Sequence, residues 1–402
     1  MRIAVREAAL YGPHFGDEKG RDMTRVIFAL SLIVWLMGCK KPYNPPAITG
    51  NGSYLVVEGV INSGADSTII KLSRTVNVSN KTTANPVLNA IVTVENDQNV
   101  SFSLTDAGNG NYVSAGLNLD NARTYRLRIK TSDNKQYLSD LVPVKITPPI
   151  DSVGYNIINV PDTGIQVYAN THDPKNSTRY YRWDFSENWQ FSAKYPSHYI
   201  ADGSIRQRRF DELITVCYSN DLSSDIVLGS SAKLRQDLIY QSPVVFIRFT
   251  SEKIEDEYAI LLHEYALTAD AYGFWENLRK NTEQLGSIFD AQPSQLQGNI
   301  HCLTNPAEPV VGYVSACTVS SKRIFIYSSD LPSWTAAYPY QCNIDSTRKG
   351  GVTIPDLILN PKLYYILDGF DTPTFPSKYT FTTQECADCT IRGTKTPPPF
   401  WR

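Results

Sequence analysis

The polar residues of this 402-residue chain do not assemble into a familiar catalytic motif. His263-Glu264 is the first half of the HExxH zinc-protease signature, but Leu267 stands where the second histidine should be. Ser230 and Lys233 have SxxK spacing, yet the KTG sequence that accompanies it in penicillin-recognising enzymes does not occur. The carboxylates show no spacing that singles out an acid–base pair. We therefore expect a protein that is not an enzyme and that uses no cofactor or metal.

Cysteines are the second group whose type and spacing could do chemistry. Apart from Cys39, they all lie in the second half of the chain, and their even number in an exported protein predicts structural disulfides. Two of them form a CxxC pair, but Gly393 and a proline run follow it, which does not suit a thioredoxin-type redox site, and a zinc ribbon would need a second CxxC. The pairing stays open. The candidate disulfide cysteines are Cys217, Cys302, Cys317, Cys342, Cys386 and Cys389.

Aromatic side chains, with 24 tyrosines among them, are the third group. The segment from Tyr180 to Phe185 alternates in the period of a strand, so we expect Tyr181, Trp183 and Phe185 to face a core. Aromatic rings in loop-like stretches can instead stack on a sugar ring or on a partner protein, although packing beneath the loops is the alternative. The candidate ligand or partner contacts are Trp189, Trp334, Tyr338 and Tyr340.

The N-terminal region predicts export and lipid attachment. The apolar run 26–36 would reach only about half of a bilayer core as a helix, so it is the hydrophobic part of a signal peptide. The string Leu36-Met37-Gly38-Cys39 resembles the lipobox of bacterial lipoproteins, which implies that Cys39 becomes the acylated first residue of the mature protein. We interpret residues 1–22 as a mis-called leader, 23–38 as the signal peptide and 39–51 as an extended, proline-rich tether.

The periodicity downstream predicts two mainly β domains. Residues 52–148 read as about seven short strands with polar turns, which is typical of an immunoglobulin-like β-sandwich. Within it, Tyr125–Lys130 alternates apolar and basic residues, and Tyr125 is a candidate tyrosine corner. Residues 149–402 form a second β-rich, disulfide-containing domain with one covering helix capped by Thr268. Its long loops, at about 190–210, 286–300 and 330–360, are candidate binding surfaces.

The whole pattern resembles a family, the Bacteroidota outer-membrane lipoproteins catalogued as domain of unknown function 4249. The resemblance implies an accessory lipoprotein that accompanies TonB-dependent receptors, and the family has no catalytic residues to carry over. It rests on Val57-Glu58-Gly59, Leu72-Ser73-Arg74-Thr75, Pro149-Ile150-Asp151-Ser152, Tyr180-Tyr181-Arg182-Trp183, Tyr272, Trp275, Phe289-Asp290-Ala291-Gln292-Pro293, Gly298-Asn299-Ile300, Cys386-Ala387-Asp388-Cys389, Gly393 and Phe400-Trp401.

Together these features predict an outer-membrane protein held by the acyl chains of Cys39, on a membrane face that the sequence leaves open. A net charge of −2 gives no case for a nucleic-acid partner. We expect a non-catalytic accessory binding component of a TonB-dependent nutrient uptake system, with the receptor as a partner and a glycan or peptide as a ligand. The alternatives are a secreted envelope hydrolase, acting on glycan or peptide with distant carboxylates, and a structural or adhesive envelope protein.

Overall fold

The computed structural model describes residues 53–76, 85–283, 298–371 and 376–401. The chain is mainly β, as predicted. Cys39, the leader, the signal peptide and the tether all lie outside the described residues, as does the Phe289–Pro293 segment of the family resemblance. Within the described parts, no helix is both long and apolar enough to cross a membrane.

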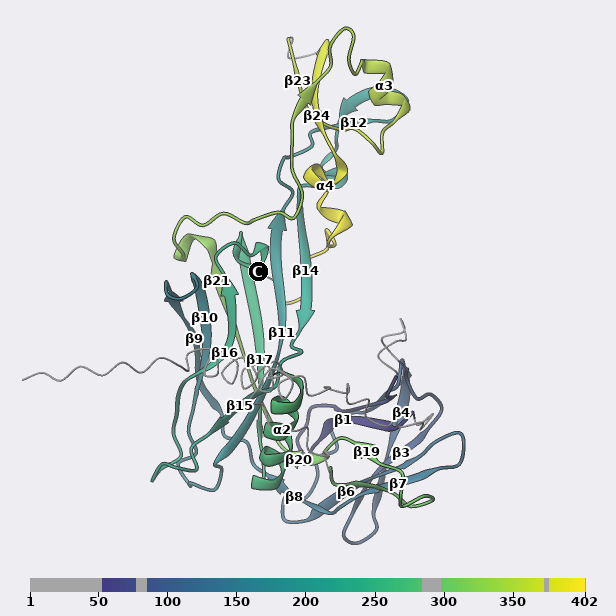
Figure 1. Ribbon diagram of the computed structural model, residues 1–402, viewed down its shortest axis with the longest axis vertical. Coiled ribbons are helices and arrows are strands. Elements are labelled where there is room, and N and C mark those ends of the chain that lie inside the picture. The colour runs from purple at the N-terminus through teal and green to yellow at the C-terminus, as the bar shows by residue number, and fades with distance from the viewer. Residues whose placement is uncertain (1–52, 77–84, 284–297, 372–375, 402) are drawn as a thin grey trace, which may run out of the picture. The chain divides into compact units, whose positions relative to one another are not determined.

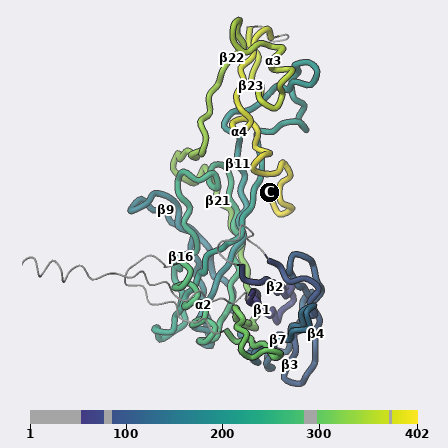
Figure 2. The backbone as a smooth tube through the Cα atoms, turned by 45° about the vertical axis from the view of Figure 1, so that its right-hand side comes forward, coloured from purple at the N-terminus to yellow at the C-terminus, as the bar shows by residue number. Residues whose placement is uncertain are grey.

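The first sheet contains eleven strands. Eight come from the first part of the chain and three from residues 300–317, which the sequence analysis placed in the second domain. The strands are β1 (Leu55–Asn62), β2 (Thr68–Arg74), β3 (Ile91–Asn96), β4 (Ser101–Gly108), β5 (Asn111–Ser114), β6 (Thr124–Lys130), β7 (Gln136–Ser139), β8 (Val142–Lys145), β18 (Ile300–Cys302), β19 (Val310–Val311) and β20 (Ser315–Cys317). Of these, β1, β3, β4 and β6 are labelled in Figure 1, and β2 and β7 in Figure 2.

This sheet closes on itself, which corrects the prediction of a plain immunoglobulin-like sandwich. Strand β20 pairs in parallel with both β1 and β8, and β8 also pairs with β6. The path β6-β3-β4-β5-β2-β1-β20-β8 therefore returns to β6. Alternating hydrophobicity shows that a strand has one buried face, but it does not show which distant strand pairs with its edge. We call this unit, with the pendant strands β7, β18 and β19, the closed sheet.

The predicted alternation within β6 is confirmed. Tyr125, Leu127 and Ile129 are buried in the core of the closed sheet. Arg126 and Arg128 face outward and pair with Glu95 at 2.9 and 2.5 Å. The Tyr125 hydroxyl donates to the carbonyl oxygen of Asp120 at 3.1 Å, which is the contact that a tyrosine corner makes.

Two further sheets share one core in the middle of the chain. The three-stranded sheet has the order β16-β10-β9, and the five-stranded sheet has the order β14-β11-β17-β21 with β15 also beside β11. As predicted, Tyr181, Trp183 and Phe185 of β11 are buried in this core. The strands are β9 (Ile150–Ile158), β10 (Gly164–Thr171), β11 (Tyr180–Ser192), β14 (Val216–Leu222), β15 (Val227–Ser230), β16 (Ile239–Arg248), β17 (Glu257–Ala266) and β21 (Val319–Tyr327).

The predicted helix is present as α2 (Ala269–Thr282). The Thr268 side chain accepts a hydrogen bond from the backbone N–H of Ala271 at 3.2 Å, so it caps the helix as expected. Ala271 and Phe274 are its buried residues. Trp275 lies beside β11, where the Arg182 guanidinium stacks on its ring at 4.4 Å.

A small C-terminal lobe surrounds the sheet β22-β24-β23 and has its own core. Its buried residues Leu357, Ile366, Tyr379 and Phe381 pack with partly buried side chains of the hairpin β12–β13. Figure 1 shows α3, β12, β23 and β24 in this lobe. The elements are β12 (Tyr199–Ala201), β13 (Ile205–Gln207), β22 (Asp345–Ser346), α3 (Ile354–Leu359), β23 (Tyr365–Phe370), β24 (Lys378–Thr382) and α4 (Gln384–Ala387). The 3₁₀ turns within the described residues are η1 (Phe210–Glu212), η2 (Glu252–Ile254), η3 (Ser328–Asp330) and η4 (Cys389–Ile391).

Candidate functional site

An open cavity of about 330 Å³ lies where the chain leaves β11 and where the loop after η3 passes it. We call it the Tyr338 cavity. Its size is at the lower end of the roughly 300–1,000 Å³ that is usual for small-molecule sites. The lining residues are Lys194, Tyr195, Ala336, Ala337, Tyr338, Tyr340 and Cys342.

Tyr338 is held firmly in the cavity wall. Its hydroxyl donates to Glu255 Oε1 at 2.7 Å, and its ring lies 5.6 Å from that of Tyr340, centroid to centroid. The Lys194 ammonium lies 5.3 Å from the centroid of the Tyr338 ring. This is within the range of cation–π attraction. The ring and the ammonium therefore position each other.

Arg392 supports the two tyrosines from the wall behind them. Its Cζ lies 5.5 Å from the Tyr338 ring centroid, 5.8 Å from that of Tyr340 and 4.7 Å from that of Phe191. Nη1 pairs with the Glu252 carboxylate, so the positive charge is balanced locally. The Nε and Nη2 atoms are buried and have no hydrogen-bond partner among the described residues.

Two other buried polar atoms beside the cavity are also unpaired. Within the described chain, neither Glu255 Oε2 nor the Tyr340 hydroxyl has a hydrogen-bond partner. Burial raises the pKa of Glu255 above its usual range, and the hydrogen bond from Tyr338 offsets only part of this effect. Unpaired buried polar groups cost free energy. Among the described residues, the fold therefore leaves these two hydrogen-bonding groups beside the cavity without a partner.

A disulfide anchors the cavity wall. Cys342, a lining residue, is bonded to Cys386 of α4, and the Tyr195 N–H donates to the Cys386 carbonyl oxygen at 3.0 Å. The Tyr195 hydroxyl lies 3.4 Å from the carbonyl oxygen of Cys342. The backbone at Tyr195 is therefore hydrogen-bonded to Cys386, and the disulfide links Cys386 to the loop that carries Tyr338.

The disulfide prediction is confirmed for four cysteines and wrong for two. Cys217 of β14 is bonded to Cys389, and Cys342 to Cys386, so the two members of the CxxC pair have different partners. Cys302 and Cys317 are free and buried in the closed sheet. Position in the second half of the sequence suggested that these two belonged to the stapled domain, but β18 and β20 carry them into another unit.

The four predicted aromatic contacts separate into two pairs. Tyr338 and Tyr340 line the cavity. Trp189 instead belongs to the core, with the Lys253 ammonium 5.1 Å from its ring centroid. Trp334 is partly buried and lies 6.2 Å from Phe249, ring to ring. These two tryptophans therefore pack against the protein itself, which was the alternative to ligand contact.

Four residues of the site were missed by the sequence analysis: Lys194, Tyr195, Glu255 and Arg392. Lys194 and Tyr195 fall within the loop at about 190–210, which the sequence analysis predicted as a binding surface. The sequence thus indicated the loop but not these two residues. Nothing in the sequence near Glu255 or Arg392 points to a tyrosine more than 50 positions away.

A second polar cluster lies on the five-stranded sheet. His263 Nδ1 is 3.0 Å from Asp184 Oδ1, and the Tyr265 hydroxyl donates to the same oxygen at 3.2 Å. Arg182 pairs with Asp184 at 2.9 Å. Burial alone would raise the pKa of the Asp184 carboxyl, but His263 and Arg182 together lower it below its usual value. Ser321 is opposite His263 in the strand register, but within the described residues no hydrogen bond joins their side chains. The cluster positions α2, because the Arg182 guanidinium also stacks on the Trp275 ring of that helix.

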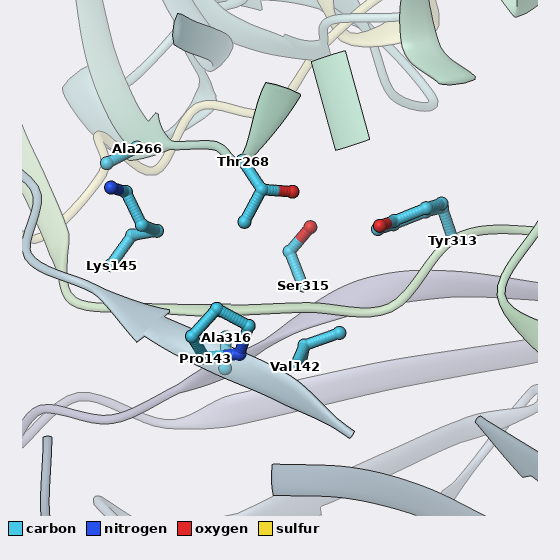
Figure 3. A pocket seen from close by; sticks show the side chains of 8 residues that line it. All are labelled: Val142, Pro143, Lys145, Ala266, Thr268, Tyr313, Ser315 and Ala316. Atoms are coloured by element: carbon cyan, nitrogen blue, oxygen red, sulfur yellow. The ribbon is translucent and has the colours of Figure 1, made fainter. Parts of the chain in front are cut away.

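A narrow crevice, shown in Figure 3, is too small to hold a ligand. Ser315 and Thr268 face it, with Lys145 and Tyr313 at opposite sides. It has no room for a water-sized sphere. The described residues also contain no group of three or more His, Cys, Asp or Glu side chains with a geometry suited to a metal ion. The Tyr338 cavity is therefore the candidate site.

The fold and the cavity define a mainly β protein with a disulfide-anchored aromatic site. The model of the family described as domain of unknown function DUF4249 matches residues 40–323, and the chain belongs to this family. No curated protein matches the chain. Among solved structures, the crystal structure of chicken CNTN1 FN1-FN3 domains is similar at 10% identity over 54% of this chain and 63% of that one, with a TM-score of 0.17. A similarity of this size carries no argument about function.

Proposed function

We propose that this protein is a non-catalytic, lipid-anchored outer-membrane protein that serves as an accessory binding component of a TonB-dependent uptake system. The anchor is Cys39, whose lipobox-like context is a feature of the sequence. The soluble body follows a proline-rich tether. A lipoprotein anchored in this way stays beside a membrane receptor and holds a ligand near it.

The observation that carries the proposal is the composition of the Tyr338 cavity. Its lining offers aromatic rings, the Tyr195 hydroxyl as an acceptor and one ammonium group, which suit a polar ligand. Among the lining residues in the described chain there is no carboxylate, imidazole or thiol that could act as an acid, a base or a nucleophile. This favours binding over turnover.

The test is a mild-detergent purification of the tagged, acylated protein from its native outer membrane, followed by mass spectrometry of the co-purifying proteins. Stoichiometric recovery of a TonB-dependent receptor is the expected result. The matched control is Cys39→Ala, which should leave the membrane and lose the receptor. Recovery of no receptor from a well-retained membrane fraction would overturn the accessory role.

A hydrolase is the second candidate, and one pair of residues favours it. Glu252 and Glu255 are two carboxylates beside the cavity in different environments: Arg392 neutralises the first, and burial raises the pKa of the second. Such a difference is typical of glycosidase acid–base pairs. Glu255 lies behind Tyr338, however, and does not line the cavity.

A screen against polysaccharides and peptides separates the two candidates. The binding proposal predicts no turnover. Turnover that is lost in Glu255→Gln and kept in Glu308→Gln, a carboxylate variant in the closed sheet, would establish the hydrolase instead. Absence of both turnover and a receptor partner would favour a structural or adhesive role in the envelope.

A further inference from the structure

The end of the chain lies along the outer edge of the five-stranded sheet. We call residues Cys389–Trp401 the C-terminal strap. Strand β14 is the last strand in the order of this sheet and pairs with β11 on one side. On its other side, the Tyr218 N–H donates to the Thr394 carbonyl oxygen at 2.7 Å, and the Thr394 N–H donates to the Tyr218 carbonyl oxygen at 2.9 Å. The strap therefore adds an antiparallel bridge to the open side of an edge strand.

Both ends of the strap are fixed to the sheet. At its start, Cys389 is bonded to Cys217 of β14, and both cysteines are fully buried. At its end, the Trp401 ring lies 5.3 Å from the Tyr218 ring and 5.8 Å from the Phe325 ring, centroid to centroid. The strap is therefore held by a covalent bond at one end and by ring packing at the other.

Gly393 allows the strap to approach β14 closely. A Cβ atom at this position would lie 2.5 Å from the carbonyl oxygen of Tyr218 and 2.9 Å from the ring of Phe191. Both distances are shorter than van der Waals contact, and the backbone oxygen cannot move without β14. A side chain at position 393 would therefore push the strap away from the edge.

The edge of β14 lacks two features that protect a sheet edge elsewhere in the chain. Strand β16, at the edge of the three-stranded sheet, contains Pro243 and pairs with β10 in a register that is interrupted twice. Prolines and bulges discourage the addition of another strand. In contrast, β14 has seven residues in unbroken register with β11, no proline, and exposed side chains at Val216 and Leu222. Without the strap, β14 would present a straight and open edge.

We propose that the C-terminal strap keeps the edge of β14 closed, and that the partner it excludes is a second copy of this chain. The N–H and C=O groups of an open edge recognise another extended strand. Two copies of one edge strand supply these groups to each other in the antiparallel sense about a two-fold axis, so the edge is complementary to itself. This inference goes beyond the proposed function, because it concerns association of the protein with itself.

Removal of residues 394–402 tests the proposal, because the shortened chain keeps all four cysteines of the two disulfides. Sedimentation velocity of the acylated protein in detergent should show a monomer for the natural protein and a dimer for the shortened one. Association should tighten by at least about tenfold, since edge pairing adds several backbone hydrogen bonds. Equal dimerisation of the natural protein, or a shortened protein that stays monomeric at the same concentrations, would overturn the proposal.

A proline at position 220 locates the contact. Because the Tyr218 N–H points to the strap, the alternation of hydrogen bonds in a strand directs the Asn220 N–H to the same open side. Asn220→Pro therefore spares the pairing with β11 but removes a donor from the open edge. In the shortened chain, this substitution should restore the monomer. A dimer that persists would mean that the copies meet through another surface.

Gly393→Ala tests the strap in the full-length chain, in case the shortened chain does not fold. The backbone N–H of Tyr218 should lose protection from hydrogen exchange, and the protein should dimerise more tightly than the natural one. The matched control is Gly273→Ala in α2, where a Cβ meets nothing within 4 Å, and it should change neither property. Full protection of Tyr218 in Gly393→Ala, or loss of that protection without dimerisation, would contradict the proposal.

Discussion

The closed sheet and the C-terminal lobe are stabilised in different ways. In the described chain, the closed sheet buries 21 hydrophobic residues in one core and keeps Cys302 and Cys317 as free thiols. The lobe buries four, and the disulfide Cys342–Cys386 ties its polypeptide to the loop of Tyr338. A core of four residues supplies little hydrophobic stabilisation, so a covalent link that restricts the unfolded chain contributes proportionally more.

The comparison also bears on the candidate site. The Tyr338 cavity lies next to the disulfide-linked segment, and its wall is made of loops rather than of paired strands. Loops leave open surface between them, whereas a closed sheet is filled from strand to strand. A small core with cross-links leaves room for a binding site, whereas the closed sheet has its interior filled by its own side chains.

The largest expected effect is the removal of the lobe disulfide. Cys342→Ser with Cys386→Ser should lower the free energy of unfolding of the lobe by roughly 2–5 kcal/mol, because the unfolded chain regains the freedom of a loop closed over a sequence separation of 44. Hydrogen exchange with mass spectrometry, region by region, measures this loss. The closed sheet should keep its protection. Equal loss of protection in both regions would contradict the comparison.

A truncation in the core of the closed sheet should destabilise that sheet and leave the lobe unchanged. Leu127 is 1% exposed in the core of the closed sheet, so Leu127→Ala should cost about 3 kcal/mol there. The lobe should be unaffected. Denaturant unfolding with and without reductant provides the check: the transition that Leu127→Ala shifts should not be the one that reductant shifts. A single transition moved by both would mean that the two regions unfold together.

Buried carboxylates should give the two parts of the chain opposite pH dependences. In the closed sheet, Arg128 and Arg126 lower the pKa of Glu95 despite its partial burial, so its stabilising contribution is present above its usual pKa and is lost as the pH falls. In β17, burial raises the pKa of Glu264 to about 7, although Trp183 Nε1 donates to it at 2.8 Å and Thr171 Oγ1 at 2.9 Å.

The Glu264 effect can be isolated with one variant. The folded chain keeps a proton that the unfolded chain releases above about 4.5, so the free energy of unfolding should fall as the pH rises from 4.5 to 7. The Glu264→Gln variant carries no titrating group at this position, so its free energy of unfolding should not fall in this way. The difference between the free energies of unfolding of the variant and of the natural protein should shift in favour of the variant by about 2 kcal/mol between pH 5 and pH 8. Thermal unfolding across that range is the measurement, with Glu58→Gln, an exposed site, as the control. A pH-independent difference would show that Glu264 is not protonated in the folded chain.

The smallest effect concerns the free thiols. Burial raises the pKa of Cys317 to about 12, so neither its exposure nor its ionisation favours reaction. The folded, acylated protein should not react with a thiol reagent at pH 8, and the denatured protein should react at both Cys302 and Cys317. Cys317→Ala should change the free energy of unfolding by only about 1 kcal/mol. Rapid labelling of the folded protein would mean that the closed sheet opens readily.

The sequence alone predicted the features that depend on neighbouring residues. The alternation of Tyr125–Lys130, the burial of Tyr181, Trp183 and Phe185 and the Thr268 cap of α2 follow from a period of two or from a single capping hydrogen bond. Two of the four aromatic candidates, Tyr338 and Tyr340, are at the site. The lipid anchor at Cys39 stays a prediction, because it lies outside the described residues.

Tertiary structure alone decided the features that depend on distant segments. The closure of the first sheet needs β20 to pair with β1 and β8, and no local pattern encodes a pairing across more than 150 positions. The same return of the chain left Cys302 and Cys317 without disulfide partners. Arg392, Glu255 and Lys194 converge on Tyr338 from separate loops, so the cavity exists only after the chain has folded. Local hydrogen bonding and periodicity are properties of a segment, whereas pairing and convergence are properties of the whole chain.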